Sequence, residues 1–167
     1  KLKEAEVSTR KAIELDPNYA IAYSNLGLIL KDLGKLKEAE VSTRKAIELD
    51  PNFAEAHYHM GLILKDLGKL QDARVSTGKA IEIKTDYADA YCHLGVLLTD
   101  LGKLQDARVS TSIAIEIKTD YSEAHSNLGT ILRDLGKLQE LLLLSKSTLE
   151  SRSINQGHKL ITLLNIT

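Results

Sequence analysis

Two histidines and the single cysteine are the residues of this sequence whose chemistry could serve a metal ion or a nucleophilic reaction. His59 and His93 lie 34 residues apart, and Cys92 directly precedes His93. A structural zinc site needs a complete tetrahedral set of ligands, and no acidic ligand at fixed spacing completes these three. A cysteine nucleophile needs an orienting acid and an oxyanion hole, for which the sequence offers no signature. We therefore predict no metal site, no cofactor and no enzyme activity.

A row of aspartates recurs with the same spacing. Catalysis needs unlike groups that converge on one point, whereas these carboxylates are like groups in a line. We predict a solvated or capping role for them. They are Asp32, Asp66, Asp100 and Asp134.

Composition narrows the classes of function. The 167 residues are 43% hydrophobic, which is typical of a globular chain, and 22 Lys and Arg balance 23 Asp and Glu to a net charge of −1. Without a basic face, nucleic acid is not expected as a ligand. A lone cysteine cannot form an internal disulfide, so we expect the cytoplasm, and the apolar stretches are too short to span a membrane.

A 34-residue repeat organises the chain. The segment Lys1–Asn18 recurs unchanged at Lys35–Asn52, and Lys69–Tyr87 recurs at Lys103–Tyr121 with two residues changed. Such a period is typical of a solenoid, in which each unit buries its apolar face against the next. Because Lys1 falls in the middle of a unit, we expect the natural chain to begin upstream.

Each unit is predicted to hold two helices. Over residues 54–66 the apolar side chains fall three or four apart, which gathers them on one face of a helix, here named helix A. A second stripe from Leu70 to Ile81 indicates helix B. Asn52, followed three residues later by Glu55, predicts a capping box at the start of helix A. Glycines that tolerate the left-handed conformation are expected to end each helix A. These are Gly34, Gly68, Gly102 and Gly136.

Two further sets of repeated residues are assigned to packing. A glycine inside helix A costs about 1 kcal/mol relative to alanine, so we expect it to permit close approach of helix B, where Ala39, Ala73 and Ala107 are small. An aromatic residue beside each turn is expected to fill the junction between successive hairpins. The sets are Gly27, Gly61, Gly95 and Gly129, and Tyr19, Phe53, Tyr87 and Tyr121.

These residues resemble the tetratricopeptide repeat, whose pattern has a Leu-Gly pair in helix A, small residues in helix B and a proline at the turn. The pair appears first as Leu26-Gly27, and the prolines are Pro17 and Pro51. The sequence of helix A is also similar to that of bacterial-type superhelical arrays found alongside glycosyltransferases. The chain departs from the family where helix B has threonine in place of an aromatic residue, which we expect to loosen the hairpin. The threonines are Thr9, Thr43, Thr77 and Thr111.

The resemblance implies an all-α fold, an α-solenoid of stacked antiparallel helical hairpins wound into a right-handed superhelix. A half repeat with helix B only occupies residues 1–19, and full repeats occupy 20–53, 54–87 and 88–121. A divergent last repeat spans 122–153, where Leu141 and Thr148 replace two alanines. A capping or truncated helix follows at 154–167.

The resemblance also places helix A on the concave side and implies a peptide-binding groove there. Three rows of side chains along it suit an extended peptide. They are a polar ladder (Asn25, His59, His93 and Asn127), an apolar row (Leu62 and Val96) and a basic edge (Lys31, Lys65 and Arg133). The family's clamp for an acidic chaperone C-terminus is not expected, because its lysine and asparagine positions hold other residues. The predicted groove residues are Asn25, Lys31, Tyr58, His59, Leu62, Lys65, Cys92, His93, Val96, Asn127 and Arg133.

The sequence thus predicts a protein-protein interaction scaffold with a protein or peptide partner. Two alternatives stay open. The array could recruit substrates for a larger glycosyl- or sulfo-transferase whose catalytic domain is absent here, or it could be a self-assembling scaffold. The second alternative rests on apolar residues of uncovered terminal helices, which favour a homo-oligomer. These residues are Leu2, Ala5 and Ile13 at one end and Leu141 to Leu144 at the other.

Overall fold

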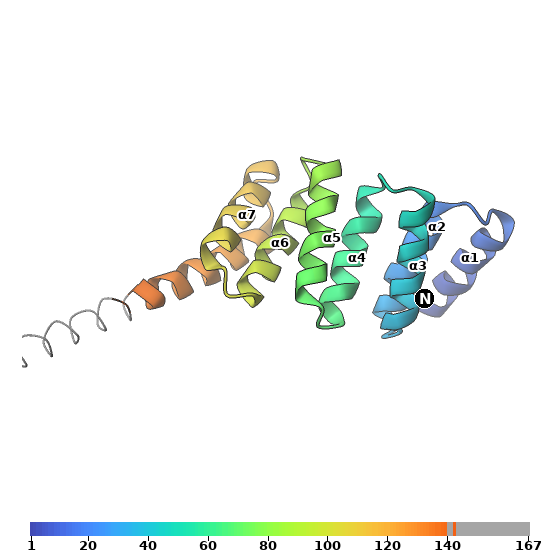
Figure 1. The fold of residues 1–167 in the computed structure, drawn as a ribbon, viewed down its shortest axis with the longest axis horizontal. Coiled ribbons are helices and arrows are strands. Elements are labelled where there is room, and N and C mark those ends of the chain that lie inside the picture. The colour runs from blue at the N-terminus through green and yellow to red at the C-terminus, as the bar shows by residue number, and fades with distance from the viewer. Residues whose placement is uncertain (140–141, 143–167) are drawn as a thin grey trace, which may run out of the picture.

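The computed structural model describes residues 1–139 and 142, and the regular structure of these residues is helical. The bounded helices are α1 (Leu2–Leu15), α2 (Ala20–Asp32), α3 (Leu36–Leu49), α4 (Ala54–Asp66), α5 (Leu70–Ile83), α6 (Ala88–Asp100) and α7 (Leu104–Ile117). Residues 122–139 are helical as well. The helices stand side by side in chain order (Figure 1), so the prediction of an all-α solenoid of hairpins is confirmed. Among the described helices, none has the length and apolar character to cross a lipid bilayer.

Glycine ends each complete helix A as predicted. Gly34, Gly68 and Gly102 have φ values of 76°, 74° and 72°, in the left-handed region that glycine adopts without strain. The turn is closed by two backbone hydrogen bonds: Gly34 N donates to Lys31 O at 2.9 Å, and Lys35 N donates to Leu30 O at 2.9 Å. These bonds satisfy carbonyl groups that the helix end would otherwise leave open.

The prediction that Gly136 also ends a helix is wrong. Residues 122–139 form one helix that continues through Gly136. The flanking residues match those around Gly102, so the local sequence permits both outcomes. A helical hairpin closes only where a second helix can dock on the first, and Leu141 stands where a docking helix B carries alanine. The rest of the predicted repeat 122–153, and the segment 154–167, lie outside the described residues.

The predicted capping box is also wrong. Helix α4 has Phe53 as its N-cap, and no side chain caps it by a hydrogen bond. Because the helix begins one residue later than a box on Asn52 requires, Asn52 lies in the preceding turn. There its backbone N donates to Asp50 Oδ1 at 3.0 Å, and Asn18 makes the same bond to Asp16. An aspartate-centred turn therefore sets the entry into helix A.

The close contact of each hairpin is between the glycine of helix A and the threonine of helix B. A Cβ added at Gly27 would overlap Thr43 Oγ1, and one at Gly95 would overlap Thr111 Oγ1. Both threonines are fully buried. The prediction that the glycines permit close approach is confirmed, while the expectation that threonine loosens the hairpin is wrong. Threonine fits because it is small enough to sit against a bare Cα.

The apolar core is shared between repeats. One cluster joins Leu26 and Leu30 of α2 to Ala39 of α3 and to Ile63 of the next helix A, α4. The same arrangement recurs with Leu97 in the following cluster. A hairpin thus completes its own core only when the next hairpin docks, as expected for a solenoid.

The two faces of the array differ in how closely successive helices approach. The backbone of α2 contacts that of α4, and α4 contacts α6, whereas within the described residues no such contact joins α1 to α3, α3 to α5 or α5 to α7. On that wider side, long side chains form ion pairs between the helices instead, such as Arg10 Nη2 with Glu38 Oε2 at 3.6 Å. The even-numbered helices therefore line the concave side, and the odd-numbered helices spread on the convex side.

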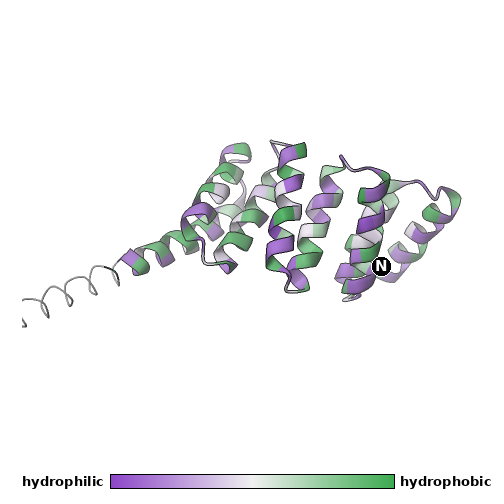
Figure 2. Ribbon diagram, in the orientation of Figure 1, coloured by the Kyte–Doolittle hydropathy of each residue, from purple (hydrophilic) through white to green (hydrophobic). Residues whose placement is uncertain are grey.

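Hydrophobic residues are not confined to the core. Figure 2 shows that hydrophobic and hydrophilic residues share every labelled helix of Figure 1. On the convex helices one valine per repeat is more than half exposed: Val7, Val41, Val75 and Val109. Helix α1 contains no buried residue, so the predicted uncovering of the first helix B is confirmed.

The glycine–threonine contact predicts a paired result for one substitution. Gly95→Ala should destabilise the array by roughly 1–3 kcal/mol, because its Cβ has no room beside Thr111. Gly129→Ala is the matched control: beyond its own helical turn, no atom of the described residues lies within 4 Å of the Cβ position, so the substitution should be neutral or stabilise by up to about 1 kcal/mol. Urea unfolding followed by circular dichroism measures both.

The double variant Gly95→Ala with Thr111→Ala should recover part of the loss, since Thr111 Oγ1 is buried without a hydrogen-bond partner. Equal effects of the two glycine substitutions would refute the close-contact explanation.

Candidate functional site

A cavity of about 210 Å³ opens on the concave face, between α4, α6 and the helix of residues 122–139. It contains seven of the predicted groove residues, drawn from three successive repeats. These are Lys31, Tyr58, Leu62, Lys65, Cys92, His93 and Val96. The structure brings these side chains together at one place, and their role in binding stays a prediction.

The other four predicted groove residues do not line this cavity. Asn25 is exposed on α2. His59 and Asn127 are part of contacts with neighbouring helices, described next. Arg133 is exposed and donates from Nη2 to Thr130 Oγ1 at 3.3 Å.

The predicted polar ladder is an internal one. Ser24 Oγ and His59 Nδ1 lie 2.8 Å apart, and Asn127 Nδ2 donates to Cys92 Sγ at 3.5 Å. Between these two pairs, the rings of Tyr58 and His93 meet edge to face with centroids 5.8 Å apart. Each pair joins one helix A to the next. The ladder therefore ties helices together with groups that the sequence suggested were free for a ligand.

His93 is the most confined polar side chain of the cavity wall. It is 8% exposed, and its Nδ1 lies 3.1 Å from Thr77 Oγ1. Its Nε2 is buried with no hydrogen-bond partner among the described residues. Burial, aided by the positive charge of Lys65, lowers the pKa of His93 to about 4. The ring is therefore neutral at physiological pH.

The predicted basic edge is neutralised by acids. Lys31 Nζ lies 3.4 Å from Asp66 Oδ2, and Lys65 Nζ lies 3.8 Å from Asp100 Oδ2. The aspartates Asp66 and Asp100, expected to be solvated or capping, thus act as ion-pair partners between neighbouring helices. The third repeat has Thr99 in place of the lysine. Lys31 and Lys65 of this edge are consequently ion-paired to carboxylates of the neighbouring helix.

The tyrosines of the cavity wall are neutral and lie near the negatively charged side chains of Asp89 and Glu123. Tyr58 packs against Tyr87 with ring centroids 5.1 Å apart, which is the junction packing expected of Tyr87. Burial, followed by the charges of Asp89 and Glu123, raises the pKa of Tyr58 to about 12. Burial and the Asp89 carboxylate at its hydroxyl raise the pKa of Tyr121 above its usual range. Both tyrosines remain protonated and neutral near physiological pH.

Cys92 has the environment of a structural cysteine. It is 1% exposed, and burial raises the pKa of its thiol. A thiol of this kind is a poor nucleophile near neutral pH, because the thiolate is the reactive form. It packs with Ala114 and Ala124, with Tyr121 at the edge of the cluster. In the described part of the chain, no three His, Cys, Asp or Glu side chains gather as metal ligands would.

Four residues of the cavity were missed by sequence reasoning: Asp66, Asp89, Tyr121 and Glu123. Tyr121 was assigned to junction packing, which it also performs. Asp66 could have been found from one geometrical signal. Contacts along the concave face join a residue to the one 35 positions later, one more than the repeat length, as in Lys31 with Asp66.

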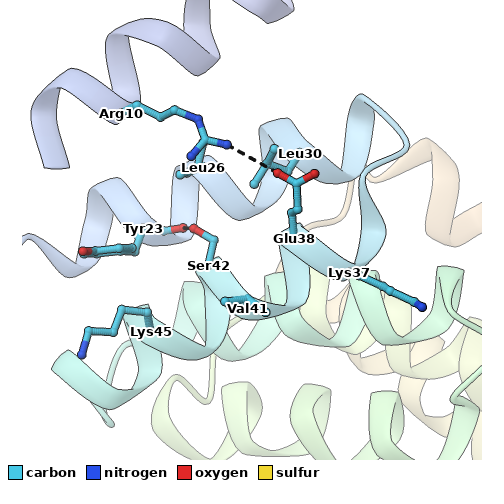
Figure 3. Close-up of a pocket in the computed structure, with 9 residues that line it drawn as sticks. All are labelled: Arg10, Tyr23, Leu26, Leu30, Lys37, Glu38, Val41, Ser42 and Lys45. Atoms are coloured by element: carbon cyan, nitrogen blue, oxygen red, sulfur yellow. Dashed lines mark hydrogen bonds and ion pairs between the residues drawn. The ribbon is translucent and has the colours of Figure 1, made fainter. Parts of the chain in front are cut away.

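Larger cavities, which the sequence analysis did not address, lie on the convex side. Figure 3 shows one of about 580 Å³ between α1, α2 and α3, with Arg10 reaching across it to Glu38. Ser42 Oγ donates to the Tyr23 carbonyl at 2.9 Å on its wall. A cavity of about 470 Å³ occupies the equivalent place between α3, α4 and α5, with Val75 where the first has Val41. These hollows follow from the spread of the odd-numbered helices.

Comparisons with known proteins agree with this geometry. Two tetratricopeptide repeat models match residues 20–53 and 43–75, and a TPR repeat model matches residues 1–34. A search of curated protein sequences gave no match. A crystal structure of MamA is similar with a TM-score of 0.72 and 29% identity, over 81% of this chain and 79% of that one.

Two further solved structures are similar. YrrB, described as a TPR protein with an unusual peptide-binding site, has a TM-score of 0.68 and 29% identity, over 79% of this chain and 68% of that one. The first TPR of Spaghetti (RPAP3), bound to the HSP90 peptide SRMEEVD, has a TM-score of 0.68 and 23% identity. It covers 70% of this chain and 93% of its own, and at this identity the likeness shows the fold alone.

The burial of His93 predicts a loss of stability in acid. Its pKa is lowered to about 4 in the folded chain from 6.5 in the unfolded chain, so its stabilising effect is complete above pH 6.5 and disappears as pH falls to about 4. The loss should be on the order of 2–3 kcal/mol. His93→Gln, which keeps a polar partner for Thr77, should flatten that part of the pH profile.

The free energy of unfolding, measured from neutral pH to about pH 4 for both proteins, tests this. Parallel profiles would contradict the assignment. A histidine Cε1–H NMR titration reads the pKa of His93 directly.

Proposed function

Because the chain is an array of tetratricopeptide repeats, we propose that it acts as a protein-interaction scaffold whose concave groove binds an extended peptide segment. The observation that carries the proposal is the concave cavity, to which four successive repeats contribute apolar, aromatic and charged side chains. Its volume of about 210 Å³ suits a side chain and the adjoining backbone of a peptide rather than a folded domain.

The internal ladder supports binding because it makes the groove rigid. Hydrogen bonds such as Ser24 to His59, and the Tyr58–His93 ring contact, hold neighbouring helices at fixed spacing before any ligand arrives. A preformed groove loses little conformational entropy on binding, so more of the contact energy appears as affinity. Leu62 and Val96 supply the apolar part of that contact.

One similar structure supports a peptide ligand. YrrB, at 29% identity, is described by its peptide-binding site. This chain shares that fold, and its own cavity lies on the concave face. A catalytic role is not proposed, because the cysteine of the groove is buried with a raised pKa.

The groove is tested by placing a charge on its apolar wall. The double variant Leu62→Glu with Val96→Glu should abolish the selection of peptides from a random linear library on immobilised array, since each carboxylate would be desolvated beneath the ligand. The double variant Val41→Glu with Val75→Glu is the matched control on the exposed convex row. It should select the same peptides as the unmodified chain.

Circular dichroism verifies that both proteins are folded. Equal selection by the two double variants would remove the concave groove as the binding site.

The acidic HSP90 peptide SRMEEVD should bind weakly or not at all. Asp89 and Glu123 line the cavity, and its lysines Lys31 and Lys65 are already paired with aspartates. Like charges across an interface oppose association. Isothermal titration calorimetry with SRMEEVD measures this, and a micromolar or tighter Kd would overturn the expectation.

A further inference from the structure

We propose that the concave cavity is a subsite for a cationic side chain, a lysine or arginine of the peptide ligand, held between Asp89 and Glu123. The inference rests on the proposed function and names the chemistry of the ligand that the groove selects. It combines two carboxylates, the Tyr58 ring and one buried polar atom at one cavity; among the described residues, the carboxylates have no ion-pair partner and the polar atom has no hydrogen-bond partner.

The two carboxylates lack the ion pair that their counterpart has. Glu55, Asp89 and Glu123 occupy the same position in successive repeats. Glu55 Oε1 lies 3.6 Å from Lys84 Nζ and is outside the cavity. Asp89 and Glu123 line the cavity, and neither forms an ion pair within the described part of the chain. Two neighbouring anions without a counter-ion attract a cation from the ligand.

The surroundings of Tyr58 show that both charges converge on one place. Asp89 and Glu123 each contribute to raising the pKa of Tyr58, after burial of its ring. Tyr58 and Tyr121 line the same cavity as the two carboxylates. The Tyr58 ring beside these carboxylates forms a suitable site for an ammonium or guanidinium group, which gains both an ion pair and a cation–π contact.

The cations of the array do not occupy this place. Lys31 and Lys65, at the other end of the cavity, are held by Asp66 and Asp100. Lys118, the equivalent of Lys84, lies over the Tyr121 ring with Nζ 4.8 Å from the centroid. The net charge of the cavity wall, after these pairs are counted, comes from Asp89 and Glu123.

His93 adds a neutral polar side chain to the wall of the same cavity. The side chain is more than nine-tenths buried and lines the cavity, and among the described residues its Nε2 has no hydrogen-bond partner. When the Thr77 hydroxyl donates to Nδ1, Nε2 carries the ring proton and needs an acceptor. With its lowered pKa, the ring is neutral and does not repel the ligand's positive charge.

The test is a selection of random linear peptides on three immobilised arrays: the unmodified chain, the double variant Asp89→Asn with Glu123→Gln, and the single variant Glu55→Gln. Peptides selected on the unmodified chain should be enriched in lysine or arginine at one position. The enrichment should persist with Glu55→Gln, because Glu55 has the same position in its repeat as Asp89 and Glu123, in the first turn of helix A. The enrichment should disappear with the double variant.

A selected peptide, measured by fluorescence anisotropy, should bind the double variant roughly tenfold more weakly. Its lysine-to-glutamine version should show no further loss on the double variant, which is the coupling that a direct contact requires. The unmodified pair should weaken as salt is raised.

The outcomes separate the two proposals. If the unmodified chain selects peptides without cationic enrichment, or if the enrichment survives in the double variant, the cationic subsite is overturned while groove binding stands. If no array selects any peptide, the proposed function fails, and the subsite fails with it.

Discussion

The contact between the glycine of helix A and the threonine of helix B sets the geometry of every complete hairpin. Without a Cβ at Gly27, Gly61 or Gly95, the threonine hydroxyl lies against the backbone of the opposite helix. This distance fixes where Leu26 and Leu30 meet Ala39, and therefore where the next helix A can insert Ile63. The shared clusters between repeats exist because each hairpin is closed tightly enough to present one continuous apolar face.

Unequal spacing on the two faces follows from this packing. Successive even-numbered helices approach one another, while the odd-numbered helices stay apart and are bridged by long side chains such as Arg10 to Glu38. The wide side leaves apolar hollows between charged bridges, as in Figure 3. The narrow side brings tyrosine, histidine and cysteine side chains of two neighbouring repeats to one small cavity. The same curvature thus makes a small concave cavity with polar walls and larger hollows on the convex side.

The one-residue stagger between neighbouring repeats determines which charged side chains form ion pairs on the concave face. Lys31 meets Asp66 and Lys65 meets Asp100, so two charge types that recur separately in the sequence neutralise one another in space. The pairing stops where Thr99 replaces lysine, and within residues 1–139 no ion pair joins a cation to Asp89 or Glu123 at the other end of the cavity. Near-identical repeats therefore produce a face whose charge is uneven, because a few substitutions decide which members are paired.

The sequence by itself determined the helices and their order. The bounds of α4 and the turns at Gly34, Gly68 and Gly102 follow from apolar spacing and from glycine's access to positive φ, which are local properties. Most of the cavity wall could be placed from the repeat register, since Tyr58, Leu62, Cys92, His93 and Val96 share the inner face of helix A. Only the tertiary structure decided that Gly136 stays helical, that His59 and His93 face Ser24 and Thr77, and that the lysines are neutralised. These outcomes depend on which side chain of a neighbouring helix arrives, and that is set by the one-residue stagger and close approach of packed helices rather than by any property of the residue itself.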